Sequence, residues 1–201
     1  IRGAGHFDRV MDFLGLLRDM DIPSKVMLTL TENNVDQVIL LGEKLRNLTD
    51  DFTFNRLSMV GEGANLRLPD PDKFTSFLRA YVTASKDNPV MGWKDNFINI
   101  LFHQNGKKPF GGCTGYGCGA AFNFVSLLSG GEVHACRKLP SPIGNIFEEH
   151  LVDIYDSSTA ERYRSGPQEC RSCPINLVCR GCLAVTYGHG RDVFEHRDPY
   201  C

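Results

Sequence analysis

The placement of the cysteines is the feature that most constrains this sequence. All eight lie in the last part of the 201-residue chain, and none precedes Cys113. They are Cys113, Cys118, Cys136, Cys170, Cys173, Cys179, Cys182 and Cys201. The C-x2-C steps at 170–173 and 179–182 allow two thiolates on one loop to reach one centre. Eight cysteines make two complete sets of four, which suits two zinc ions or two iron–sulfur clusters.

Spacing alone leaves three interpretations open: four disulfides, two structural zinc sites, or two iron–sulfur clusters. Nothing in the sequence marks the chain as secreted, and 42% of its residues are apolar, enough for a core without cross-links. Disulfides are therefore the least favoured interpretation. C-x2-C pairs are common to zinc and to iron–sulfur sites, so the spacing does not decide between the two.

Composition excludes several classes of protein. The formal net charge is −2, which is not the strongly basic balance of a nucleic-acid-binding domain. No apolar run approaches the length of a membrane-spanning helix, and the first residues lack the pattern of a signal peptide. We expect a cytoplasmic protein without nucleic-acid or membrane partners. The first residues also read as the middle of a longer protein.

The first half alternates helical and strand patterns. Apolar spacing predicts a helix over 6–20, a strand over 26–31, and a helix capped by Asn33-Asn34. A strand over 51–60 and a helix starting at Asp70-Pro71 follow. This alternation predicts parallel strands with right-handed crossovers, as in the later part of a larger α/β sheet or barrel.

The second half has a different composition, because glycine and cysteine become frequent from about residue 109. Residues 86–108 are expected to form a linker. The runs 122–128 and 132–136 flank Ser129-Gly130-Gly131 and predict a β-hairpin. A short helix is expected over 146–155.

The cysteine pattern resembles that of the SPASM domain, the C-terminal extension of radical SAM enzymes that modify peptides and proteins. The family signature begins Cys-x9–15-Gly-x4-Cys, and Cys118-x12-Gly131-x4-Cys136 fits it. Cys170-x2-Cys173-x5-Cys179 and the final Cys201 fit the remainder, whereas the step to Cys182 is one residue shorter than usual. Cys113 matches the extra upstream cysteine of members that hold two fully ligated clusters.

The resemblance implies a fold and a domain organisation. Residues 1–85 would be the C-terminal part of a partial (β/α) radical SAM barrel, 86–108 a linker, and 109–201 the SPASM domain with its hairpin. The fold class is thus α/β followed by a small α+β metal domain. Three stretches resemble successive segments of that barrel: Ile1-Arg2-Gly3 with 5–8, Thr29-Leu30-Thr31, and 52–63.

By the same resemblance, two auxiliary 4Fe–4S clusters would be bound for electron transfer or substrate binding. One ligand set would be Cys113, Cys118, Cys136 and Cys182, and the other Cys170, Cys173, Cys179 and Cys201. Arg2 falls where the family has an arginine that pairs with the carboxylate of S-adenosylmethionine. The C-x3-C-x2-C motif that binds the third 4Fe–4S cluster and S-adenosylmethionine is absent, so the chain is expected to be an inactive fragment when alone. No catalytic residue can be named, since Arg137 stands where some relatives have an acidic residue.

The functional expectation is an oxidoreductase in peptide maturation, with a ribosomally made peptide or protein as substrate and a flavodoxin or ferredoxin as electron donor. The run 179–185 resembles maturases of small selenocysteine- or cysteine-containing peptides. The alternative is a four-cysteine zinc module that binds a protein partner. A truncated barrel with exposed strand edges also predicts self-association.

Overall fold

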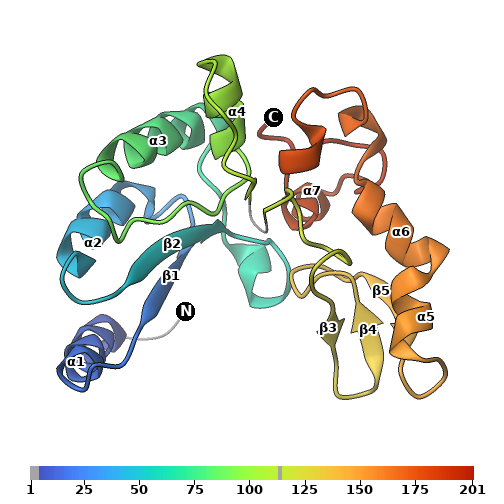
Figure 1. Cartoon of the computed structure of the whole chain (residues 1–201), viewed down its shortest axis with the longest axis horizontal. Helices are drawn as coiled ribbons and strands as arrows, with labels where there is room; N and C mark the ends of the chain where they lie inside the picture. Colours follow the sequence, from blue (N-terminus) through green and yellow to red (C-terminus); the bar gives the residue numbers. More distant parts are fainter. Residues whose placement is uncertain (1–4, 113–114) are drawn as a thin grey trace.

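The chain folds into two lobes that meet at the middle of the molecule (Figure 1). The computed structural model describes residues 5–112 and 115–201. Residues before about 112 form the first lobe, and the cysteine-rich remainder forms the second. The C-terminus returns to the junction of the two lobes, so the last cysteine lies next to both.

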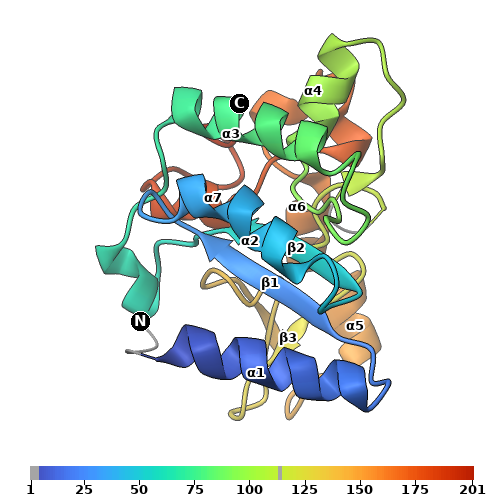
Figure 2. The same cartoon turned by 90° about the vertical axis from the view of Figure 1, so that its left-hand side faces the viewer.

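The first lobe is a two-stranded parallel sheet with helices packed against it. Strands β1 and β2 pair in register from Lys25↔Asp51 to Leu30↔Arg56. Helices α1 and α2 lie on the side of the strands that faces away from the second lobe (Figures 1 and 2). The elements of this lobe are α1 His6–Asp19, β1 Lys25–Leu30, the 3₁₀ turn η1 Val35–Gln37, α2 Val38–Leu45, β2 Asp51–Arg56, the 3₁₀ turn η2 Gly61–Asn65, α3 Pro71–Ala84 and α4 Ile98–Gln104.

Most expected elements of this lobe form, with two corrections. Helix α3 begins as predicted, because the Asp70 carboxylate accepts a hydrogen bond from the N–H of Lys73. Strand β2 is shorter than expected and ends at Arg56 instead of 60. Asn34 does not cap the next helix with its side chain. Its amide instead bonds the backbone of Thr29 and Thr31 and closes the end of β1.

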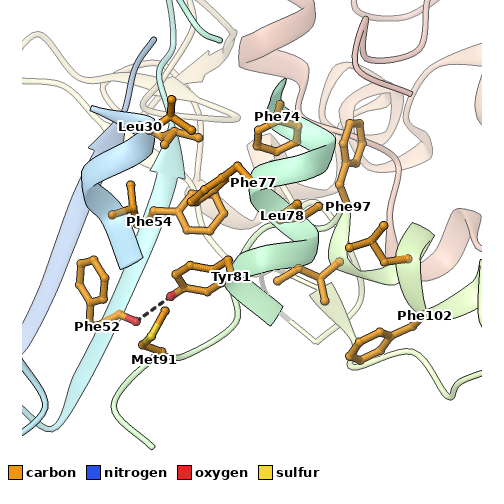
Figure 3. Close-up of a cluster of buried hydrophobic side chains, with 14 of the residues drawn as sticks. Leu30, Phe52, Phe54, Phe74, Phe77, Leu78, Tyr81, Met91, Phe97 and Phe102 are labelled. Carbon is orange, nitrogen blue, oxygen red and sulfur yellow. Dashed lines mark hydrogen bonds between the residues drawn. The ribbon is translucent and has the colours of Figure 1, made fainter. Parts of the chain in front are cut away.

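The core of the first lobe is aromatic (Figure 3). The alternation of β2 sends Phe52, Phe54 and Arg56 to one buried face. Phe54 makes edge-to-face contacts with Phe77 and Tyr81 of α3, with ring centroids 5.1 and 5.0 Å apart. The Tyr81 hydroxyl donates to the backbone oxygen of Phe52 or Gly92, which ties α3 to β2.

Residues of the expected linker pack into this same core. Val90, Met91, Phe97, Ile98 and Leu101 are all buried in it. The N–H of Phe52 donates to the oxygen of Val90, and the N–H of Gly92 to the oxygen of Phe52, so the segment adds to the free edge of β2. The apolar run at 97–102 lies largely within α4.

The second lobe combines a small antiparallel sheet with short helices. Its strands are β3 Ser126–Leu127, β4 Glu132–His134 and β5 Pro142–Asn145, in the order β3-β4-β5. Its helical elements are α5 Leu151–Asp156, α6 Ser158–Ser165, η4 Gln168–Cys170, η5 Asn176–Val178 and α7 Leu183–Gly188. A separate core holds this lobe together, with Val133, Ile143, Ile154 and Leu183 among its members.

Two features of this lobe depart from expectation. The sequence did not predict β5, which pairs with β4. The helix expected over 146–155 begins only at Leu151. A turn precedes it, because the Asn145 side chain accepts from the N–H of Phe147 while its backbone oxygen accepts from Glu148 and Glu149.

Among the described helices, none has both the length and the apolar character needed to cross a membrane.

Candidate metal centres

The structure divides the seven described cysteines between two cavities. Cys118, Cys136 and Cys182 line the first, which has a volume of about 300 Å³. The four others, Cys170, Cys173, Cys179 and Cys201, line the second. This is the same division as the two ligand sets named above, and the role of these thiols as ligands stays a prediction. Cys113 and Arg2 lie outside the described residues.

Loop ends and helix ends present the thiols of the first cavity. Cys136 follows β4, and its sulfur accepts a hydrogen bond from the N–H of Lys138 at 3.4 Å. Cys182 stands at the start of α7. Four cationic residues, Arg56, Lys94, Arg137 and Lys138, also line this cavity, together with Asp95.

The second cavity is narrower, with a volume of about 30 Å³, room for about one water molecule. Cys170 ends η4 and Cys179 directly follows η5. The sulfur of Cys179 accepts a hydrogen bond from the N–H of Gly181 at 3.5 Å. A four-iron cluster in this cavity requires the cysteine loops to move apart.

Gly181 lines both cavities, which therefore lie back to back. Its φ is +62°, a left-handed conformation that glycine adopts without strain. A Cβ atom at this position would lie 2.5 Å from the Cβ of Asp198. The segments that contain Gly181 and Asp198 can therefore approach each other closely between the cavities only because glycine has no side chain.

Burial governs the acidity of these thiols. It raises the pKa of Cys170 to about 11 and that of Cys179 to about 12. Neighbouring thiols add to both shifts, Cys201 and Cys173 for Cys170, and Cys201 for Cys179. Burial also raises the pKa of Cys136, and Cys182 adds to that shift. A metal that binds these groups as thiolates must displace their protons.

The donor set fits a sulfur-ligated metal group. All seven described cysteines are free thiols, so none of them forms a disulfide. No histidine or glutamate lines either cavity, and the carboxylates that do, Asp95 in the first and Asp198 in the second, are paired with Arg56. Sulfur-only ligation is the chemistry of iron–sulfur clusters and of four-cysteine zinc sites. Within residues 5–112 and 115–201, no three His, Cys, Asp or Glu side chains lie close enough together to hold a single metal ion.

A buried ion-pair network stands between the cavities and joins the lobes. Arg56, at the end of β2, contacts the carboxylates of Asp95 at 2.7 Å and Asp198 at 2.8 Å. Burial opposes the charge on Arg56, but the two carboxylates outweigh it and raise its pKa. The rings of Phe97 and Phe74 lie 4.3 and 5.3 Å from the guanidinium carbon.

The same network reaches both cysteine sets through the backbone. The Asp198 carboxylate accepts hydrogen bonds from the N–H of Cys182 at 2.9 Å and of Tyr200 at 3.0 Å. Tyr200 directly precedes Cys201. Asp198 therefore fixes a backbone segment of each cavity with one side chain.

Asparagines of the first lobe hold the loop of Cys179. The Asn96 amide donates to the backbone oxygens of Cys179 at 2.9 Å and Gly181 at 3.1 Å. The Asn99 amide donates to the backbone oxygen of Val178 at 2.7 Å. Both asparagines are buried, so these bonds are shielded from water.

Sequence reasoning missed this whole set of supporting residues. One signal for Arg56 was present, because the alternation of Phe52 and Phe54 places position 56 on the buried face of β2. An arginine at such a position needs a buried partner. No pattern in the sequence indicates that Asp198, 142 residues later, supplies it.

Residues 118–182 match the SPASM family, described as an iron–sulfur cluster-binding domain. These residues are thus similar to a SPASM domain. The chain is 26% identical over 218 residues to the AdoMet-dependent heme synthase of Methanosarcina barkeri. It is also 23% identical over 193 residues to the antilisterial bacteriocin subtilosin biosynthesis protein AlbA of Bacillus subtilis.

The alignments cover most of this chain but only part of each relative. They include 98% of this chain and 61% of the heme synthase, and 89% of this chain and 40% of AlbA. The SPASM match begins at Cys118 and ends at Cys182, so it includes the first cavity's described cysteines and three of the second.

Proposed function

We propose that this chain acts as part of a radical SAM enzyme that modifies a ribosomally synthesised peptide or protein, and that its two cysteine sets hold two auxiliary 4Fe–4S clusters. The observation that carries the proposal is the division of the described cysteines between two adjoining cavities, with six of the seven inside the segment that matches the SPASM family. Cys113 would complete the first set of four ligands.

When bound, such clusters supply one-electron transfer or an iron site for substrate. The residues of the chain hold and orient the sulfur ligands. Asp198 fixes the backbone at Cys182 and at the residue before Cys201, and Asn96 fixes the backbone at Cys179. Arg56 holds Asp198 in place from the other lobe.

The substrate class follows from the relatives' names and from the first cavity. AlbA is named for the biosynthesis of a bacteriocin, which supports a peptide substrate. The heme synthase supports a second candidate, a haem precursor. Lys94, Arg137 and Lys138 suit an anionic group, such as a carboxylate of either substrate, and also offset thiolate charge.

S-adenosylmethionine and a third 4Fe–4S cluster belong to the same proposal. Their usual cysteine motif is not within these 201 residues. Arg2 remains the proposed contact to the carboxylate of S-adenosylmethionine.

Metal analysis of the anaerobically purified chain tests the proposal. We expect about eight irons and eight acid-labile sulfides for each 201-residue chain, with a broad absorption band near roughly 400 nm. About two zinc ions without sulfide would refute it and support the zinc-module alternative. A chain with disulfides and no metal would refute both.

A further inference from the structure

One end of the second lobe exposes a group of large apolar side chains. Their exposed fractions lie between 46 and 77%, and they are Leu127, Leu128, Phe147, Leu151 and Val152. The first two lead into the turn of the β3–β4 hairpin, Phe147 follows β5, and the last two begin α5. In Figure 1 the hairpin turn and the start of α5 lie at the same end of this lobe. We call these five residues the tip patch.

Contacts between the hairpin and the segment around α5 make the tip patch one surface. A Cβ atom at Gly131, in the hairpin turn, would lie 2.5 Å from Cδ2 of Phe147, so the ring lies directly against this turn. Leu127 pairs opposite Val133, so both side chains lie on one face of the sheet. Val133 packs in the same core as Ile154 of α5, which places Leu127 on the face that α5 covers. Single exposed apolar residues are ordinary, but such a group indicates an interaction surface.

Carboxylates are interleaved with the apolar residues of the patch. From residue 139 to residue 160 the chain has no lysine or arginine, and its acidic residues are Glu148, Glu149, Asp153 and Asp156. All four are exposed, and the described residues provide no ion-pair partner for any of them. This charge is local, because the whole chain has a net charge of only −2. The tip therefore combines apolar contact area with negative charge that the protein itself does not balance.

The charge decides which kind of partner fits this surface. The four carboxylates repel nucleic acid, an anionic membrane surface and an acidic protein. A cationic partner is attracted, and its basic side chains can pair with the carboxylates at the edge of the contact. Apolar side chains placed between those charges would cover the patch, as in interfaces with an apolar centre and a polar rim.

We propose that the tip patch binds a basic amphipathic polypeptide segment, in which apolar side chains alternate with lysine or arginine. Phe147 is the expected central contact, because it is 77% exposed and aromatic side chains contribute most to such interfaces. No residue of the tip patch lines either cysteine cavity. The inference therefore goes beyond the proposed function and does not depend on which metal the cysteines bind.

Fluorescence anisotropy with two dye-labelled synthetic peptides tests the inference. The first peptide is an amphipathic helix of leucine and lysine, and the second has glutamate in place of every lysine. We expect the anaerobically purified 201-residue chain to bind the lysine peptide and not the glutamate peptide. Added salt should weaken the binding, because it screens the attraction between exposed charges.

Substitutions separate the apolar contribution from the charge. Phe147→Ser should weaken binding of the lysine peptide about tenfold, and Val152→Ser, at a position 63% exposed, provides a second apolar variant if Phe147→Ser folds poorly. The double variant Asp153→Asn with Asp156→Asn should bind more weakly and depend less on salt. Leu40→Ser is the matched control, because Leu40 of α2 is 65% exposed but lies in the first lobe. It should bind like the wild type.

Three binding results would overturn the inference: no binding of the lysine peptide, equal binding of the glutamate peptide, or an equal loss in Leu40→Ser. Light scattering tests whether a second copy of the chain covers the patch instead. Dimers that become monomers in Phe147→Ser but not in Leu40→Ser would show this and would also overturn the inference. Wild-type protein without iron and sulfide would refute the proposed function and leave the binding result in place, so the two failures are distinguishable.

Discussion

Arg56 and Asp198, separated by 142 residues in the chain, form a buried ion pair at 2.8 Å in which each side chain is at most 2% exposed. Arg56 belongs to the sheet of the first lobe, and Asp198 belongs to the tail that carries Cys201. This pair is the point at which the α/β lobe meets the cysteine-rich lobe. It also places a fixed carboxylate between the two cavities.

Removing Arg56 should destabilise the fold strongly. Arg56→Met leaves Asp95 and Asp198 buried without a counter-charge, and we expect a loss of about 3–5 kcal/mol in the free energy of unfolding. Urea denaturation measures this loss, with wild type and variant compared at the same metal content. Lys73→Met is the matched control, because the Lys73–Asp36 pair is also 2.7 Å long but exposed. The control should lose less than about 1 kcal/mol, and equal losses would contradict the buried-pair argument.

Single cysteine substitutions should remove one cluster at a time. Cys136→Ala should lose about four irons from the first cavity, and Cys173→Ala about four from the second. The double variant should lose the sum of the two. Iron and sulfide counts provide the measurement. A single variant that loses all iron would show that the sets do not fill independently.

Gly181→Ala should disturb both cavities, because the added Cβ would approach Asp198 to 2.5 Å and the φ of +62° disfavours a side chain. We expect reduced iron in both sets, together with lower thermal stability. Gly190→Ala is matched, since Gly190 has φ +69° but nothing within 4 Å of the new Cβ. It should cost only about 1–2 kcal/mol and retain its iron. Equal iron loss in both variants would show that the contact with Asp198 is unimportant.

Tyr81→Phe should cost about 1 kcal/mol at pH 7, because it removes the buried hydroxyl that donates to the Phe52 or Gly92 oxygen. Burial raises the pKa of Tyr81, so the folded state retains a proton that the unfolded state releases above about pH 10. Stability from this group is therefore present below pH 10 and lost as the pH rises further. The difference between wild type and variant should shrink between pH 9 and 11 in denaturation experiments. A constant difference would contradict the assignment.

The first lobe should support self-association. Phe13 and Leu16 of α1, and Met20 directly after it, are 56, 54 and 59% exposed, and within the described residues β1 pairs with β2 alone. Apolar surface beside an unpaired strand edge favours pairing with another chain. Size-exclusion chromatography with light scattering should report dimers or larger species. Leu16→Asn should shift the distribution toward monomer, and a monomeric wild type would refute the prediction.

Local signals explain why much of the first lobe was predictable. The apolar spacing over 6–20 predicted one helix, and Asp70-Pro71 predicted the start of another. Both signals depend only on residues within a few positions of each other, so they can be read from the sequence. The parallel pairing followed from strand–helix–strand order. Strand β5 and the late start of α5 were missed, since Pro142–Asn145 and the turn at Asn145 have no strong local preference outside this sheet.

The sequence by itself determined the family resemblance, because the cysteine spacing is local information, and that resemblance implied the division of the cysteines into two sets. Only the tertiary structure decided what surrounds them. Arg56 meets Asp95 and Asp198, and Asn96 holds the loop of Cys179, through contacts between segments whose separation in sequence carries no signal. Burial makes those contacts consequential, because charges and donors taken out of water must find partners inside the protein.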